Sequence, residues 1–467
     1  MTKTLYDKLW ERHRIAALAD DLDWLYVDRH FIYEINSTQM EELRASARKL
    51  SQPRRTIGVM DHSSSSAPGR TQVAPWAAKH IERMRVESRL AGIPLLDEDT
   101  PDQGIAHVSG PELGLTLPGM LVLCGDSHTS THGALGVLAW GIGATEIQTV
   151  LATQTIAQRK AMSMRARFEG KMKPAVTAKD LILALIARHG AGGGLGRALE
   201  LAGSTVAAMD MDSRMTLCNM SIEFGAKWGM VGVDDTTIEY SSTRPYGPKG
   251  RLLDAAIHDW RTLHSDEGAI FEREIAMDVS AIEPQVTWGT SPEHSISIGD
   301  RMPHPDSQPN PGKRKAWEAA YTYMGLQPGV PIAGVPVDHV FIGSCTNGRL
   351  SDIREAARVV RGRKVASGVK AWVVPGSVRV RREAEAEGLH RILIDAGFEW
   401  REPGCSMCGG SNGDLVLKPG QRCMATQNRN FVNRQGEGVR THLGSAATAA
   451  ATAIAGVIAD PRPLLEN

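Results

Sequence analysis

Apolar runs and amphipathic stretches alternate along most of the chain, separated by turns rich in glycine. The apolar run at residues 121–124 precedes a turn, and a helix-like stretch at residues 145–158 follows it. Residues 56–60 are strand-like, residues 335–343 end in a strand-like apolar run, and residues 351–360 have the spacing of an amphipathic helix. Short strands alternating with helices are typical of proteins that layer both. The sequence therefore predicts an α/β fold.

Four other segments carry weaker patterns. Residues 190–196 are rich in glycine but lack the spacing of a dinucleotide-binding motif, so we expect a loop after a helix-like stretch. Residues 291–315 are polar and rich in proline, which is typical of a linker. The alanine-rich residues 446–455 predict a packed helix. The first twenty residues alternate charged and apolar groups like an amphipathic helix.

Length, charge and hydropathy exclude several classes of function. A chain of 467 residues is too long for one ordinary core, so we expect more than one domain. Lysine plus arginine and aspartate plus glutamate both number 53, so no net field attracts nucleic acid or an anionic membrane. No stretch approaches the roughly 18 uninterrupted apolar residues of a membrane-spanning helix. We predict a soluble cytoplasmic protein that binds neither nucleic acid nor membrane.

Three cysteines lie in two distant segments with distinctive neighbours. Cys345 stands in Phe341-Ile-Gly-Ser-Cys-Thr-Asn347, at a predicted strand-to-helix turn, and two more stand in Pro403-Gly-Cys-Ser-Met-Cys408. The backbone N–H groups at a helix start favour a thiolate, and glycines let the backbone wrap closely around a bulky group. An iron–sulfur cubane normally takes four cysteines, so three would leave one iron open as a Lewis acid.

Other interpretations of the cysteines are weaker. A structural zinc site needs four ligands, and a redox dithiol would not need Cys345. We expect Cys124, Cys218 and Cys423 to be buried structural thiols. Six cysteines in 467 residues, without a secretory signal, fit a reducing compartment.

Two polar segments follow predicted strands. Residues 125–133, Gly-Asp-Ser-His-Thr-Ser-Thr-His-Gly, hold one carboxylate, two imidazoles and four hydroxyls, and Asp61-His62 closes the strand at residues 56–60. Histidine exchanges protons near neutral pH, and an adjacent carboxylate fixes its tautomer. A polar turn or a helix cap explains the same residues equally well. Glu223 fits a solvated helix, and Arg429 and Arg434 fit either a solvated edge or a fork for carboxylates.

Taken in order along the chain, these segments resemble the aconitase superfamily. The two cysteine segments are joined by Cys124-Gly-Asp-Ser-His-Thr-Ser-Thr-His-Gly133 and by Asn428-Arg-Asn-Phe-Val-Asn-Arg434. The opening residues 2–9, Met60-Asp-His62, Thr216-Leu-Cys-Asn-Met220 and Thr441-His-Leu443 extend the resemblance over nearly the whole chain. Within the superfamily, they are similar to large subunits of 3-isopropylmalate dehydratases.

The resemblance implies a three-domain α/β/α arrangement around a central iron–sulfur cluster. We expect boundaries at residues 1–162 with the two histidine segments, 163–306 with Glu223 and the linker, and 307–467 with the cysteines. The family positions imply one 4Fe-4S cluster held by Cys345, Cys405 and Cys408, catalytic roles for Asp61, His62, Asp126, Ser127, His128 and Glu223, and substrate binding by Asn347, Asn428, Arg429 and Arg434.

The reaction implied by the resemblance isomerises 2-isopropylmalate and 3-isopropylmalate through 2-isopropylmaleate, by removing and re-adding water, in leucine biosynthesis. His62 and His128 would manage the protons. Single-chain relatives carry a further swivelling domain that supplies a serine base, and this chain ends before such a domain. We therefore expect a separate small subunit and a heterodimer.

Three local departures keep the substrate open. Typical isopropylmalate members have His where Tyr33 stands and a Leu-Ala-Met stretch in place of Gly409-Gly-Ser411, and the segment Ser63-Ser-Ser-Ser-Ala-Pro68 is also unusual. A sibling hydro-lyase reaction on citramalate or citraconate, maleate, a benzylmalate or homocitrate is the alternative. A more remote alternative is an aconitase-like RNA-binding protein, against which the neutral charge counts.

Overall fold

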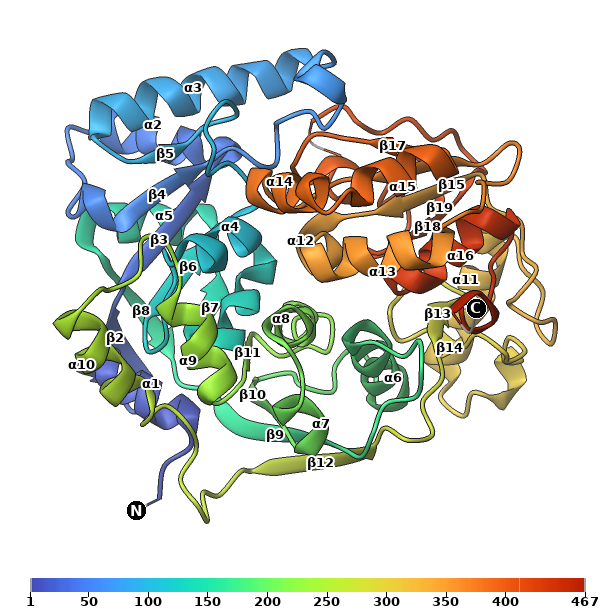
Figure 1. The fold of residues 1–467 in the computed structure, drawn as a ribbon. Coiled ribbons are helices and arrows are strands. Elements are labelled where there is room, and N and C mark those ends of the chain that lie inside the picture. The colour runs from blue at the N-terminus through green and yellow to red at the C-terminus, as the bar shows by residue number, and fades with distance from the viewer. Residues whose placement is uncertain (1, 411, 466–467) are drawn as a thin grey trace. The chain divides into compact units, whose positions relative to one another are not determined.

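The structure is a computed structural model that describes residues 2–410 and 412–465 (Figure 1). Contacts group these residues into two compact units. Unit 1 comprises the described residues up to Ser64 together with Val73–Gly170 and Gly194–Asp278. Unit 2 comprises Ser65–Gln72, Lys171–Gly193 and the described residues from Val279 onward. The expected three-domain division stays a prediction.

Unit 1 is built around a five-stranded parallel sheet of order β5-β4-β3-β6-β7, which can be followed in Figure 1. The chain enters at the middle strand β3, adds β4 and β5 on one side, and then adds β6 and β7 on the other. The carboxyl ends of β3, β4 and β6 therefore share one edge, where the strand order reverses and α/β sheets bind ligands. The strands are β3 (Arg29–Tyr33), β4 (Thr56–Val59), β5 (Leu95–Leu96), β6 (Leu121–Cys124) and β7 (Leu138–Gly141).

Two further sheets and most of the helices complete unit 1. A parallel sheet of order β11-β10-β9-β12 contains β9 (Met162–Glu169), β10 (Arg197–Ala202), β11 (Trp228–Met230) and β12 (Arg273–Asp278). An antiparallel sheet contains β1 (Arg14–Ala19), β2 (Leu22–Tyr26) and β8 (Thr155–Arg159). The helices are α1 (Leu5–His13), α2 (Ser37–Ala45), α3 (Pro75–Ala91), α4 (Ala106–Leu113), η4 (Ser127–Leu135), α5 (Ala144–Thr153), α7 (Ser204–Ala207), α8 (Met211–Asn219), α9 (Asp235–Ser242) and α10 (Arg251–Trp260).

Unit 2 contains a second five-stranded parallel sheet, of order β17-β16-β15-β18-β19. It too starts at its middle strand, so the ends of β15 and β18 meet where the order reverses. The strands are β15 (His339–Ile342), β16 (Lys370–Val373), β17 (Phe398–Trp400), β18 (Arg422–Ala425) and β19 (Arg440–Leu443), with a hairpin of β13 (Gln285–Thr287) and β14 (Ser295–Ser297). The helices are α6 (Ala178–His189), α11 (Pro311–Met324), α12 (Ser344–Asn347), α13 (Leu350–Val360), α14 (Val378–Ala386), α15 (Leu389–Ala396), α16 (Ala446–Ala455) and α17 (Arg462–Leu465).

Most predicted elements are present near the expected residues. The strand predicted at residues 56–60 is β4, the amphipathic stretch at residues 351–360 is α13, and the alanine-rich stretch is the buried helix α16. The glycine-rich residues 190–196 form turns after α6, as expected. No helix in the described part of the chain is long and apolar enough to cross a membrane.

Three predictions of local structure need correction. The stretch at residues 145–158 is helical only as far as Thr153, because Gln154 adopts a left-handed φ of 59° and β8 follows. The amphipathic start of the chain is a helix only in α1, and the apolar residues after it form β1, which pairs with β2. Strand pairing here overrides a helical spacing. The segment expected to be a linker holds β14 and the start of α11, where Asn310 caps the helix and Pro311 needs no N–H partner.

Candidate active site

The end of β4 and the end of β6 bring the two predicted histidine segments together in unit 1. Asp61 and His62 follow β4, and Asp126, Ser127 and His128 follow β6, with β3 lying between the two strands. The Nε2 atom of His62 lies 3.1 Å from Oδ2 of Asp126. Parallel strand pairing thus joins residues that are 64 positions apart in the sequence.

His62 is held by carboxylates on both sides of its ring. Its Nδ1 atom lies 2.6 Å from Oδ1 of Asp61, and its Nε2 atom faces Asp126. The other Asp61 oxygen accepts the N–H of Ala106, the first residue of α4, at 3.0 Å. Asp61 is therefore fixed by a helix start and in turn fixes the direction of the imidazole.

Asp126 is the common partner of three histidines. It caps η4 by accepting the N–H of His128 at 2.6 Å, so the helix-cap interpretation of this residue is also correct. The Nδ1 atom of His128 lies 3.2 Å and the Nε2 atom of His107 lies 3.4 Å from the same Asp126 oxygen. Burial alone would raise the pKa of Asp126, but the bonds from His107, His128 and His62 outweigh it and hold that pKa well below its usual range.

His128 also contacts Glu223, which follows α8. The Nε2 atom of His128 lies 3.0 Å from Oε1 of Glu223, a carboxylate that is only 8% exposed and so is not a solvated helix residue. Burial works to lower the pKa of His128, but the charges of Glu223 and Asp126 raise it above its ordinary value. Ser127 lies beside the ring, with its Oγ atom 3.5 Å from Nδ1 of His128.

The sequence analysis assigned no role to three residues of this constellation, Glu34, His107 and His132. Glu34, after β3, has no exposed surface and accepts the backbone N–H groups of His62 at 3.2 Å and Ser63 at 3.1 Å. Burial, with the nearby charge of Asp61, raises the pKa of Glu34 to about 7. His107 lies in α4, with its Nδ1 atom 3.1 Å from Nε2 of His132. His132 closes the polar segment at residues 125–133 and could have drawn attention; the other two carry no local signal.

The three predicted cluster cysteines lie within unit 2. Cys345 is the second residue of the short helix α12, which begins two residues after β15 ends, as the strand-to-helix prediction expects. Cys405 and Cys408 enclose a tight turn in which the Cys408 N–H donates to the Cys405 carbonyl at 3.0 Å. None of the three forms a disulfide with a described residue, and these cysteines are only 6% to 7% exposed.

Asn428, after β18, connects the two cysteine segments. Its Nδ2 atom lies 3.6 Å from the Cys345 sulfur, and its Oδ1 atom lies 3.9 Å from the Cys408 sulfur. Arg434 places Nη2 3.7 Å from the same Cys408 sulfur. Soft thiol donors gathered on two turns beside a cation fit the ligation of an iron–sulfur cluster, whose thiolates carry negative charge.

The remaining predicted substrate-binding residues lie in or near the segments that carry Cys345 and Asn428. Asn347 donates to Asp352 at 2.9 Å, and Asn428 donates to the Thr346 hydroxyl at 3.0 Å. Arg429 is half-buried, and Arg434 has a buried Nε atom for which the described residues offer no hydrogen-bond partner. Such a guanidinium is available to a carboxylate ligand.

A buried lysine supports the segment that carries Asn428. Lys179 of α6 has no exposed surface, and its Nζ atom donates to the carbonyls of Thr426 at 2.8 Å and Gln427 at 2.6 Å. Lysine is rarely buried without such partners, because its charge loses water. The amphipathic pattern of α6 gave no sign of this role.

The unusual serine run is hydrogen-bonded to carboxylates. In unit 2, the Ser66 N–H donates to Asp414 at 2.8 Å, and the Ser66 hydroxyl donates to that of Ser406 at 2.7 Å, inside the Cys405–Cys408 turn. Ser406 has a left-handed φ of 48°, so this turn is held in a conformation that side chains disfavour. Ser411, named with the other departures, lies outside the described residues.

The other three cysteines are buried as predicted. Cys124, Cys218 and Cys423 are at most 1% exposed. Burial raises the pKa of each thiol above its ordinary value, which keeps the group neutral.

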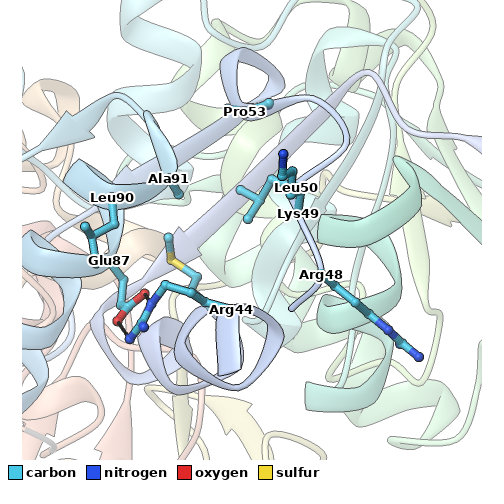
Figure 2. Close-up of a pocket in the computed structure, with 9 residues that line it drawn as sticks. Arg44, Arg48, Lys49, Leu50, Pro53, Glu87, Leu90 and Ala91 are labelled. Carbon is cyan, nitrogen blue, oxygen red and sulfur yellow. Dashed lines mark hydrogen bonds and ion pairs between the residues drawn. The ribbon is translucent and has the colours of Figure 1, made fainter. Parts of the chain in front are cut away.

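A cavity of about 340 Å³ between α2 and α3 of unit 1 shares no residue with the predicted site (Figure 2). Arg44 and Glu87 form a two-pronged ion pair at one end, with bonds of 2.8 Å and 3.0 Å, and the Arg48 side chain points away. The charge of Glu87 is thereby neutralised within the protein. The lining residues are Met40, Arg44, Arg48, Lys49, Leu50, Pro53, Glu87, Leu90 and Ala91.

Comparisons with known proteins identify proteins that are similar to this chain. The profile of the aconitase family (aconitate hydratase) matches residues 7–456. The chain is 53% identical over 463 residues to 3-isopropylmalate dehydratase large subunit 1 of Bradyrhizobium diazoefficiens, covering 99% of this chain and 97% of the relative. Aconitase X of Thermococcus kodakaraensis, in its holo-form crystal structure, is similar with a TM-score of 0.46 and 11% identity, covering 87% of this chain and 84% of that one. Because the family profile and this relative both span nearly the whole sequence, the chain belongs to the aconitase family.

Proposed function

We propose that the chain is the large subunit of a 3-isopropylmalate dehydratase. This hydro-lyase isomerises 2-isopropylmalate and 3-isopropylmalate through 2-isopropylmaleate, in leucine biosynthesis. The observation that carries the proposal is the 53% identity to a protein of that name over nearly the full length of both chains. The gathering of thiols in unit 2 and of histidines with carboxylates in unit 1 supports it.

Family membership implies an iron–sulfur cluster. We propose one 4Fe-4S cluster, held by Cys345, Cys405 and Cys408. Such a cluster, when bound, supplies an iron that acts as a Lewis acid toward hydroxyl and carboxylate oxygens. Asn428 and Arg434 contact the thiols directly and would orient them and balance their charge.

The histidines of unit 1 would carry the protons of the reaction. The Asp61–His62 pair would help the hydroxyl leave as water. His128 favours its protonated form, since Glu223 and Asp126 raise its pKa, and would take part in the proton transfers. Asp126 stays ionised because its pKa is held low, so it accepts bonds from His62 and His128 throughout. Asp61 fixes the tautomer of His62, and the Ser127 hydroxyl is placed to bond a substrate oxygen.

The substrate is a dicarboxylate, which needs paired donors at each end. Arg434, with its buried Nε atom, would bind one carboxylate through two parallel bonds, and Arg429 would help to neutralise its charge. Asn347 and Asn428 would supply amide donors. Such contacts hold the substrate in both directions of the reaction.

We also propose a small-subunit partner, in a heterodimer, and a cytoplasmic location. The small-subunit partner rests on the name of the relative, a large subunit. The cytoplasmic location rests on six cysteines that form no disulfide among the described residues, which suits a reducing compartment. The residues and domain boundaries expected from the family are part of this proposal.

The experiment that tests the proposal uses the chain reconstituted without oxygen, with iron and sulfide, and mixed with the small subunit of the same organism. Loss of the ultraviolet absorbance of 2-isopropylmaleate should report hydration. The proposed substrate is wrong if citraconate or maleate gives a specificity constant about a hundredfold higher.

The cluster is tested separately by its visible absorbance. Serine at Cys345, Cys405 or Cys408 should abolish this absorbance, whereas Cys423→Ser, a matched change at a buried thiol outside the set, should retain it. Full activity in an iron-free zinc protein would contradict the proposed cofactor.

A further inference from the structure

The last residue of the central strand β3 touches both histidine loops of unit 1. The ring of Tyr33 stacks on the imidazole of His62, with 4.2 Å between ring centroids and an angle of 24° between the planes. The phenol hydroxyl of Tyr33 donates to the carbonyl of Gly125 at 3.0 Å. Gly125 immediately precedes Asp126, the carboxylate that faces the other edge of the same imidazole.

The turn that begins at Tyr33 also holds Gly125 by close packing. A β-carbon at Gly125 would lie 2.4 Å from Oδ1 of Asn36, so any other residue there would displace the Asn36 side chain. Asn36 and Tyr33 belong to one turn after β3. The Gly125–Asp126 backbone therefore has two contacts with that turn, a packed surface and the phenol hydrogen bond.

These contacts matter because the His62–Asp126 interaction joins two loops that no strand pairing connects. β4 and β6 both pair with β3 and not with each other. The 3.1 Å contact between His62 and Asp126 depends on how the imidazole is tilted and on where the Asp126 loop stands. Tyr33 restrains the tilt of the imidazole by stacking on it, and it restrains the position of the Asp126 loop by its hydroxyl hydrogen bond to Gly125.

We propose that Tyr33 is a positioning residue that couples the two histidine loops and keeps the His62 imidazole aligned with Asp126. The inference rests on the proposed function, in which His62 manages a proton. The ring is half-buried and stands between the loops, so neither loop moves without disturbing the stack or the hydrogen bond. Stacking and hydrogen bonding thus act on one proton-transfer group.

Two substitutions separate the contributions of the ring and the hydroxyl. Tyr33→Phe keeps the stack and removes the bond to Gly125, and should lower kcat about threefold. Tyr33→Leu removes both contacts and should lower kcat about tenfold or more. KM should stay nearly constant in both variants, because substrate carboxylates are bound elsewhere. Tyr246→Phe, which removes the hydroxyl of an exposed tyrosine bonded to Asp102, is the matched control and should not change kcat.

A second measurement does not depend on activity. In protein labelled with nitrogen-15 histidine, the His62 signals can be assigned by their loss in His62→Asn. Tyr33→Leu should shift these nitrogen signals, while Tyr246→Phe leaves them in place. Unchanged His62 signals, or a raised KM with an unchanged kcat, would overturn the positioning role. An inactive wild type with the expected nitrogen shifts would refute the proposed function and leave the coupling standing.

Discussion

Replacing Glu34 by glutamine should change how stability depends on pH. Glu34 has no exposed surface, and its two oxygens accept the backbone N–H groups of His62 and Ser63. Burial raises its pKa from 4.5 to about 7 in the folded protein. Between these values the unfolded chain has released the proton and the folded chain has not, so folding takes up a proton.

The direction and size of this pH dependence follow from the proton that Glu34 takes up on folding. Because the folded pKa is the higher one, the favourable contribution of Glu34 is fully present below pH 4.5 and is lost as the pH rises through 7. Each pH unit in this window costs about 1.4 kcal/mol, so the total loss is roughly 3 kcal/mol. Glutamine has no such dependence, but its amide nitrogen would face an N–H group, which costs about 1–3 kcal/mol at every pH.

The assay compares urea unfolding of the wild type and of Glu34→Gln at pH 5, 6, 7 and 8. The variant should be the less stable protein at pH 5, and the difference should shrink or reverse by pH 8. The change Glu41→Gln, at a partly exposed residue of α2, is the control and should give a constant difference. Parallel stability curves for wild type and Glu34→Gln across this range would show that Glu34 is ionised in the folded state, and the reasoning would fail.

Three further predictions test other contacts. Glu223→Gln should move the kcat–pH limb that belongs to His128 toward lower pH, because the carboxylate that raises its pKa is gone; an unmoved limb would contradict this pairing. Arg434→Lys should raise KM about tenfold with kcat largely kept, since a point charge replaces a fork, and unchanged steady-state constants would favour the solvated-edge interpretation. Gly133→Ala should lower the free energy of unfolding by about 1–3 kcal/mol, because the new β-carbon would lie 1.8 Å from the Gly229 carbonyl oxygen. Gly192→Ala is the control: its β-carbon would meet no atom within 4 Å, so it should have little effect on the free energy of unfolding measured in urea.

The parts of the site that the sequence predicts are those with a local signature. Cys345 lies in the first turn of a helix that follows a strand, and Cys405 and Cys408 lie among glycines, so their backbone setting could be inferred from neighbours alone. Local patterns did not show which of these residues are close in space, and that expectation came from the family resemblance. Asn428, for example, lies 83 positions from Cys345 and contacts its sulfur.

Glu34 and Lys179 could not be found in this way, for a physical reason. A single acid after a strand and a lysine on an amphipathic helix are both expected in water. Their burial depends on backbone donors and acceptors from distant segments, such as the His62 N–H and the Thr426 carbonyl. The same limit explains the overextended helix at residues 145–158, where pairing of β8 with β2 decided the structure.

The shared strand order of the two five-stranded sheets has a consequence for how such an enzyme can diversify. In both sheets the predicted reactive groups stand on loops that follow strands of the sheet: after β4 and β6 in unit 1, and after β15, β17 and β18 in unit 2. An exposed loop residue such as Gly409, whose φ of −116° suits any side chain, can therefore change at little cost to folding, and under the proposed function such a change would alter the alkyl group that the site accommodates. Chemistry and substrate range become separately heritable traits of one scaffold, so a lineage can exchange one malate derivative for another while its proton carriers stay in place.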